Sequence, residues 1–194
     1  MAGEDDSQGY ALSADPEARA KQLALHSYVA RHVEMVRRVL ATARDVEQRR
    51  IAAEMLGYAG TSREQIHALI RASRDVDDGV RNNAIRALGV VARSSREAAA
   101  IIPGQCFVDL LNSPLWTDRN KSAGLLSVLT AHRDATLLVC LREQALTSLI
   151  EMARWSYFGH AYGARIMLGR IAGMDERPLL SIVAKNEVEP IIAS

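Results

Sequence analysis

The stretch "DVDDGVRNNAIRALGVVARSS", residues 75–95, carries the pattern that decides the fold. An acid, Asp77, is followed by Arg81, Ala84 and Leu88 at spacings of four, three and four residues. Such spacings place side chains on one face of an amphipathic helix. The acid suits a capping position before that helix, and the small Ala84 lets a neighbouring helix approach closely. The stretch therefore predicts a helix that begins beside Asp77 and buries Leu88 against a neighbour.

The same order of residues recurs along the chain, which indicates a repeat. Thirty-two residues earlier it is found at Asp45, Arg49, Ala52, Leu56 and Gly57. Weaker matches follow at Asp118, Lys121, Gly124 and Val128, and again at Ala164, Leu168 and Gly169. Each matched stretch is preceded by another amphipathic segment, over residues 18–43, 62–74, 103–112 and 136–153. The repeating unit is therefore a helical hairpin of about 32–40 residues, with residues 177–194 as a partial fifth copy.

Local signals support a chain made of helices. Asp15 followed by Pro16 is a typical helix start, and Ser62 with Gln65 three residues later forms a capping box. No stretch alternates polar and apolar residues as a half-buried strand does. Residues 1–14 contain three consecutive acids at 4–6 and little to bury. We therefore expect an all-α chain with a flexible acidic tail over residues 1–14 and one repeat domain over residues 15–194.

These motifs resemble those of a known class of repeat. "DVDDGVRNNAIRALG" and "DVEQRRIAAEMLG" resemble the second helix of a HEAT repeat. "AAIIPGQCFVDLLNSPLWTDRNKSAGLLSVL" is similar to the armadillo variant, in which a Pro opens a helix that ends in Leu-Leu. The resemblance covers roughly residues 20–190. It implies a right-handed α-α superhelix of about four to five hairpins. It also implies a scaffold or adaptor that binds a protein or peptide partner along a concave face lined by the second helices.

Composition and targeting signals indicate a soluble protein. Apolar residues make up 48% of the chain, charged residues 24%, and the formal net charge is +1. No apolar run approaches the length that spans a bilayer, and the N-terminus lacks the apolar core of a signal peptide. Cys106 and Cys140 lie among apolar residues, as free thiols of a reducing compartment do. We expect a cytoplasmic protein, unless a leader precedes this sequence.

No motif for catalysis, a cofactor or a metal is evident. The five histidines are scattered, and none belongs to a His-Glu-x-x-His pair. No glycine-rich phosphate loop follows a strand, and the acids Asp77 and Asp78 are better explained as a helix cap than as a catalytic pair. We therefore expect that the protein is not an enzyme and has neither a cofactor nor a metal site.

A basic region leaves one alternative open. Residues 16–96 contain 15 Arg and Lys against nine Asp and Glu, and such an excess could follow a phosphate backbone. The alternative is a solenoid-shaped nucleic-acid-binding protein or an enzyme similar to a helical-repeat DNA-repair glycosylase. Acids stand beside the arginines, however, as in "RDVEQRR", and this favours ion pairs on a solvated face. We expect no nucleic-acid partner.

The register of the repeat predicts a binding surface. If Ala84 and Leu88 face the core, Asn82 and Arg86 point away from it on the second helix. The same register selects Arg50 and Glu54, then Ser122 and Leu126, then Tyr162 and Ile166. The candidate partner-binding residues are Arg50, Glu54, Asn82, Arg86 and Tyr162. Tyr162 is the expected anchor, because exposed Tyr is a favoured hot-spot residue.

The segment "RWSYFGHAYG", residues 154–163, is unusually aromatic. Trp155, Tyr157, Phe158 and Tyr162 are four of the nine aromatic residues of the chain. Two interpretations remain open from the sequence. The segment is either a binding hot spot or a large turn that packs over the end of one hairpin.

Overall fold

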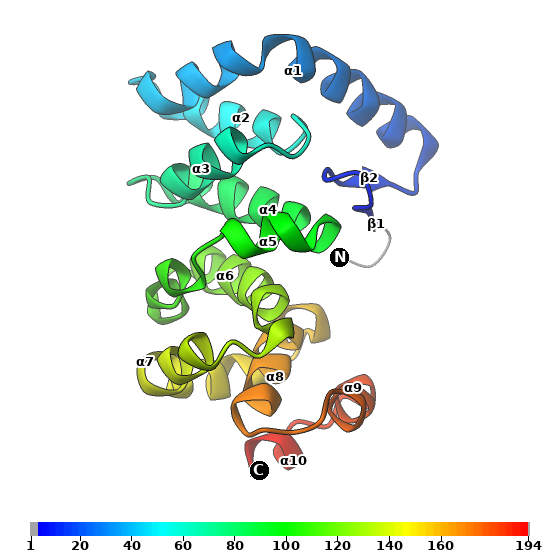
Figure 1. Cartoon of the computed structure of the whole chain (residues 1–194), viewed down its shortest axis with the longest axis vertical. Coiled ribbons are helices and arrows are strands. Elements are labelled where there is room, and N and C mark those ends of the chain that lie inside the picture. Colours follow the sequence, from blue (N-terminus) through cyan, green and yellow to red (C-terminus); the bar gives the residue numbers. More distant parts are fainter. Residues whose placement is uncertain (1–3, 194) are drawn as a thin grey trace. The chain divides into compact units, whose positions relative to one another are not determined.

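The computed structural model describes residues 4–193, and its contacts divide the chain into two compact units. Unit 1 ends at Ile102 and unit 2 begins at Pro103, so the boundary lies inside the single repeat domain that the sequence predicts. Figure 1 shows that both units are built almost wholly of helices. Within the described part, the strands are two segments of two residues each, near the N-terminus.

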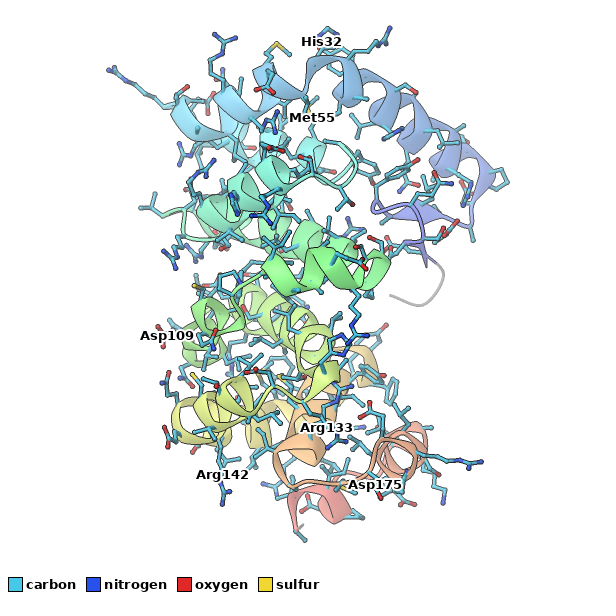
Figure 2. The ribbon with its side chains drawn as sticks, in the orientation of Figure 1. His32, Met55, Asp109, Arg133, Arg142 and Asp175 are labelled. Atoms are coloured by element: carbon cyan, nitrogen blue, oxygen red, sulfur yellow. The ribbon has the colours of Figure 1, made fainter. Side chains whose placement is uncertain are left out.

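Unit 1 contains a small hairpin and five helices. Their bounds are β1 Glu4–Asp5, β2 Leu12–Ser13, α1 Pro16–Thr42, α2 Val46–Leu56, α3 Arg63–Ala72, α4 Asp78–Ser94 and α5 Arg96–Ile101. Asp15 caps α1 by accepting from the backbone N–H of Ala18 at 2.8 Å, as the sequence predicts. The long helix α1 bends at His32, which has a non-helical backbone and is labelled in Figure 2.

The repeat motif has the same local structure in α2 and α4. Asp45 and Asp77 each cap their helix, accepting a backbone N–H at 2.9 Å. Arg49 Nη1 donates to the carbonyl oxygens six and five residues before it, at 3.0 and 3.2 Å. Arg81 Nη1 makes the same two bonds at 2.9 and 3.0 Å. The arginine of the motif therefore closes the turn that precedes its own helix.

The apolar positions of the motif form the core of unit 1. Leu56 and Leu88 are both fully buried, and the small Ala52 and Ala84 are buried beside them. α2 packs against both α1 and α4, and α3 packs against α4. The predicted burial of both leucines is confirmed.

Residues 4–13, which belong to the predicted flexible tail over residues 1–14, form a short hairpin in the structure. β1 pairs antiparallel with β2, with Glu4 opposite Ser13. Tyr10 and Leu12 are buried and form an apolar cluster with Tyr58, against which Leu25 packs. These two side chains give the segment a buried apolar surface beyond its acidic first residues. The first three residues of the predicted tail lie outside the described residues.

Unit 2 contains helices that pack around α8. The bounds are η1 Gly104–Phe107, η2 Asp109–Asn112, α6 Trp116–Leu129, η3 Thr130–His132, α7 Ala135–Ala153, α8 Phe158–Ile171, α9 Glu176–Ala184 and α10 Glu189–Ile192. The helix expected over residues 103–112 is thus two short 3₁₀ turns. α8 packs against α6, α7 and α9.

The register predicted for the second helices is wrong in unit 2. Ser122, Leu126 and Ile166 were expected to point away from the core, but their exposed fractions are 0%, 0% and 1%. α6 and α8 begin after Leu115 and Tyr157, whose side chains make no capping bond. Without the capping acid, the sequence offers no fixed point from which to count helical faces.

Two buried arginines tie α8 to its neighbours. Arg170 donates to the carbonyl oxygen of Ser127 at 2.5 Å, to Thr130 Oγ1 at 2.9 Å and to Glu176 at 2.6 Å. Arg165 Nε donates to the carbonyl oxygen of Ala153 at 2.8 Å, and burial lowers the pKa of this guanidinium. Such pairing is what permits a charged side chain to be buried.

Two glycines of unit 2 differ in the space beside them, which gives a test of the α6–α8 contact. A Cβ at Gly163 would lie 2.6 Å from the carbonyl oxygen of Ala123, whereas a Cβ at Gly124 would meet nothing within 4 Å. Gly163→Ala should therefore lower the free energy of unfolding by about 1–3 kcal/mol. Gly124→Ala should raise it by about 0.5–1 kcal/mol, because alanine favours helix. Urea titration followed by circular dichroism measures both, and equal effects would contradict the packing.

Candidate functional site

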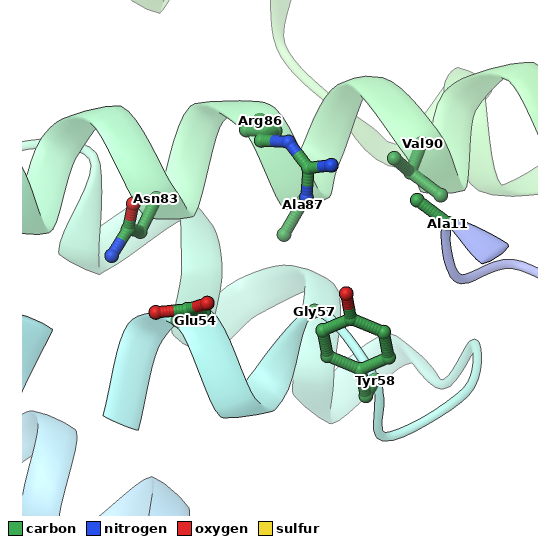
Figure 3. A pocket seen from close by; sticks show the side chains of 8 residues that line it. All are labelled: Ala11, Glu54, Gly57, Tyr58, Asn83, Arg86, Ala87 and Val90. Atoms are coloured by element: carbon green, nitrogen blue, oxygen red, sulfur yellow. The ribbon is translucent and has the colours of Figure 1, made fainter. Parts of the chain in front are cut away.

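A shallow pocket of about 280 Å³ lies between α2 and α4 in unit 1. Its lining is Ala11, Glu54, Gly57, Tyr58, Asn83, Arg86, Ala87 and Val90. Figure 3 shows Asn83, Arg86 and Val90 on α4, opposite Glu54 and Tyr58 at the end of α2. Ala11 of the N-terminal segment lies beside Val90 in this view. The pocket thus combines a carboxylate, an amide and a guanidinium with small apolar walls.

Two residues of the predicted surface line this pocket, Glu54 and Arg86. Glu54 is exposed, and Arg86 is half-buried. Asn82 is half-buried and donates from Nδ2 to Asn83 Oδ1 at 3.0 Å, but Asn83 itself is the pocket residue. Asn83 also donates to the carbonyl oxygen of Arg50 at 3.1 Å. Of the two α4 residues that the repeat register selects, Arg86 lines the pocket, whereas Asn82 lies beside the pocket residue Asn83.

Arg50 lies on the same helix as Glu54, but it holds a structural ion pair. Its Nε and Nη2 donate to the two carboxylate oxygens of Asp77, at 2.7 and 2.6 Å. This paired geometry holds the pKa of Asp77 at about 2 and raises the pKa of Arg50. Arg50 therefore connects α2 to the start of α4, beside the pocket rather than inside it.

A second pair reinforces this connection. Arg49 donates from Nε and Nη2 to the two carboxylate oxygens of Asp75, at 2.8 and 3.0 Å. The pKa of Asp75 is lowered by this bond with Arg49. Two adjacent arginines of α2 thus form ion pairs with two acids of the turn before α4, and both acids belong to residues 75–95.

The N-terminal segment meets the α4 face through further ion pairs, which sequence reasoning did not find. Arg86 Nη2 donates to Glu4 Oε1 at 2.7 Å, and Arg93 Nε donates to Asp6 Oδ2 at 2.6 Å. No local pattern signals these pairs, since the partners are 82 and 87 residues apart in the sequence. Charge complementarity between residues 4–6 and the basic region was the available clue.

Tyr162 lies in unit 2, and 38% of it is exposed. Its ring meets that of Phe158 edge-to-face, with centroids 5.9 Å apart. The nearby Trp155 is half-buried under the guanidinium of Arg119, 5.2 Å from the ring centroid, while 65% of Tyr157 is exposed. A second shallow depression is lined by Trp116, Trp155, Ser156, Tyr157 and His160. In the aromatic segment, Trp155 is therefore half-buried, whereas Tyr157, Phe158 and Tyr162 are exposed.

Other chemistry has little support in the part of the chain that the structure describes. No group of three or more His, Cys, Asp or Glu side chains there could hold a metal ion. Cys106 and Cys140 are half-buried and are not joined in a disulfide, and burial raises the pKa of Cys140. Between residues 4 and 193, no helix is both long and apolar enough to cross a bilayer.

Comparison with known proteins identifies the fold. No family model matches the chain, and no curated protein sequence matches it. An engineered protein of known structure has a TM-score of 0.62 and 18% identity, over 93% of both chains. A computationally designed armadillo repeat protein for modular peptide recognition has a TM-score of 0.61 and 15% identity, over 92% of this chain and 86% of its own. The chain has an armadillo/HEAT-like helical repeat fold. The predicted fold class, an all-α superhelical repeat, is confirmed.

A further armadillo neighbour was solved with a ligand. It is a designed armadillo repeat protein in complex with the peptide (KR)4, with a TM-score of 0.61 and 15% identity, over 93% of this chain and 86% of its own. At such identity the likeness concerns the fold. The pocket lies between α2 and α4, the two helices of unit 1 that carry the repeat motif.

The Arg50–Asp77 pair makes the stability of this fold depend on pH. Asp77 has a pKa of about 2 in the folded chain, below the value of about 3.9 for an unfolded Asp. Its carboxylate therefore stabilises the fold fully above about pH 5, and this contribution is lost as the pH falls toward 2. Asp77→Asn keeps a capping side chain but removes the ion pair. We expect its melting temperature to fall less steeply than that of the wild type between pH 5 and 2.

The partner residue supplies the control for this pH dependence. Arg50→Gln should flatten the same part of the stability curve in part, because the capping bond from Val80 still lowers the pKa of Asp77, and the double variant should be no flatter than Asp77→Asn alone. Differential scanning calorimetry at several pH values measures this. Additive effects would show that the two residues act independently.

Proposed function

We propose that the protein is a peptide-binding repeat scaffold that holds an extended segment of a partner against the second helices α2 and α4. The surface comprises the exposed Glu54, the half-buried Asn83 and Arg86, and the apolar residues between them. In unit 2, the exposed Tyr162 and its aromatic neighbours are a second place for partner contact. The role is binding rather than catalysis, in the cytoplasm.

The observation that carries this proposal is the segment that already lies there. Residues 4–13 lie on this surface as a short hairpin whose strands are Glu4–Asp5 and Leu12–Ser13, with Ala11 at the pocket and the carboxylates of Glu4 and Asp6 on arginines of α4. A surface that accepts a short strand of its own chain has hydrogen-bonding and charged groups that can accept a strand of another chain. Two designed neighbours of the same fold, one for modular peptide recognition and one bound to (KR)4, support the proposal by analogy.

The nucleic-acid alternative receives less support from the arrangement of charge. Arg49, Arg50, Arg86 and Arg93 each pair with a carboxylate, so these four arginines do not form a row of available cations. A phosphate backbone binds best to a continuous row of available cations. We therefore retain the expectation that the partner is a protein or peptide.

Peptide selection tests the proposed function. We expect the full chain to enrich binders from a displayed library of random peptides. Glu54→Ala and Asn83→Ala should each weaken the selected peptides by about tenfold, or 1.4 kcal/mol, because these side chains offer the polar groups of the pocket. His67→Ala is the matched control, since His67 is exposed on α3 and lines neither pocket. Fluorescence anisotropy measures the affinities. A library that yields no binder would refute the proposal.

The role of Tyr162 is tested separately. Some of the selected peptides should bind unit 2. Tyr162→Ala should weaken their binding free energy by 2 kcal/mol or more, because an exposed Tyr is a favoured hot-spot residue. Its melting temperature should stay close to that of the wild type, because the ring is partly exposed and contacts chiefly Phe158. Ile166→Ala, one turn later and buried, should instead lower the melting temperature. Unchanged affinity for Tyr162→Ala would make the aromatic segment purely structural.

A further inference from the structure

The hairpin of residues 4–13 is held at two places of different chemistry. Its second half is anchored by Tyr10, which stacks on His26 with ring centroids 4.3 Å apart, and by the buried Leu12. Its first half contributes only acids. Glu4 and Asp6 pair with α4, and Asp5 pairs with Arg19 of α1 at 3.1 Å. Releasing the acidic contact therefore breaks its ion pairs and the short β1–β2 pairing, whereas Tyr10 stays stacked on His26 and clustered with Tyr58.

The acidic contact follows the periodicity of both partners. Glu4 and Asp6 are two residues apart, so they point to the same side of an extended chain. Arg86 and Arg93 are seven residues apart, so they lie on the same side of α4, two turns from one another. Val90 lies between them and is covered by the segment near Ala11. The α4 face is thus built to receive a strand that carries acids on one side.

The contact is also incomplete. Each acid uses one carboxylate oxygen, and the other, Oε2 of Glu4 and Oδ1 of Asp6, is shielded and has no hydrogen-bond partner within the described chain. A shielded acceptor left without a partner costs free energy. The two strands contribute two residues each, and so short a hairpin adds little stability of its own. Residues 4–6 therefore cover this part of α4, but two of their carboxylate oxygens are left without a hydrogen bond there.

We propose that the Arg86–Arg93 surface of α4 binds an extended acidic peptide segment of a partner protein, and that Glu4 and Asp6 are an internal competitor for it. This inference rests on the proposed function and specifies the partner. Arg86 and Arg93 place two positive charges on one side of α4, and these attract an acidic chain once Glu4 and Asp6 leave them. The exposed Glu54 across the pocket limits the acidic stretch to the α4 side. A basic peptide such as (KR)4, bound by a designed neighbour, would meet like charge here.

The test uses the full chain and two synthetic probes. The acidic probe is a fluorescein-labelled peptide with Glu at alternate positions separated by Gly and Ser, and the neutral probe has Gln in place of each Glu. Glu4→Gln combined with Asp6→Asn removes the internal competitor. Glu17→Gln combined with Glu34→Gln makes the same change in net charge at exposed acids of α1, which do not contact α4.

Fluorescence anisotropy at low salt should give a clear order of affinities. The variant lacking Glu4 and Asp6 should bind the acidic probe at least about tenfold more tightly than the wild type or the Glu17 and Glu34 control. Adding Arg86→Gln and Arg93→Gln should abolish this gain, and the neutral probe should bind none of the proteins. Equal binding by the wild type and the Glu4 and Asp6 variant, or binding that survives loss of both arginines, would overturn the inference.

A second measurement needs no substitution. Hydrogen exchange of the unmodified chain should quicken over residues 4–9 when the acidic probe is present in excess, because the probe displaces them. Unchanged exchange at saturating probe would overturn the inference even if a variant failed to fold. Should peptides from the displayed library bind through Glu54 and Asn83 while the acidic probe does not bind, this inference fails and the proposed function stands.

Discussion

The bond between Arg50 and Asp77 is the constraint on which unit 1 depends. One carboxylate caps α4 through the backbone N–H of Val80 and also receives the guanidinium of Arg50 from α2. Because a single side chain serves both purposes, α4 cannot slide or rotate against α2 without losing the cap, the ion pair, or both. The side chain of Asn83 on α4 depends on the same alignment, since it donates a hydrogen bond to the carbonyl oxygen of Arg50 on α2. The pocket between the helices therefore has fixed walls, and binding there need not first order the surface.

Unit 2 reaches a comparable packing by different chemistry. Its second helices lack capping acids, and buried guanidinium groups take their place as connectors. Arg170 joins α8 to the end of α6 and to α9. Its buried guanidinium donates to the carbonyl oxygen of Ser127 and to the carboxylate of Glu176, so its N–H groups have partners. Close approach of backbones at Gly163 completes the contact. A repeat fold thus tolerates the loss of its sequence signature when another interaction supplies the same alignment.

The sequence was informative where the interaction was local and uninformative where it was distant. The caps at Asp15, Asp45 and Asp77 were predictable, because a cap and its helix lie within a few residues. Burial of Leu56 and Leu88 followed from the register that those caps fix. In unit 2, where no acid marks the helix start, counting along the repeat placed the buried Leu126 and Ile166 on the surface. Glu54 and Arg86, which the register selected, line the pocket between α2 and α4, and so does Asn83, which it did not select. A repeat register gives the face of a helix only to within about one residue, because helix boundaries are uncertain by that much.

The N-terminal hairpin shows how charge pairing over long sequence distances escapes local composition. Three consecutive acids predicted a flexible tail, and the arginines of residues 16–96 were expected to pair with acids close to them in sequence. In the fold, Glu4 and Asp6 instead lie on Arg86 and Arg93, and the buried Tyr10 and Leu12 pack beside them in the same segment. Charge that appears in excess along one stretch of sequence is therefore not free charge in the fold. The strength of the contacts between residues 4–6 and α4 determines how accessible Arg86 and Arg93 are to a partner. An exchangeable acidic segment would make this face selective, because only a partner that offers better carboxylate contacts than Glu4 and Asp6 gains by replacing them.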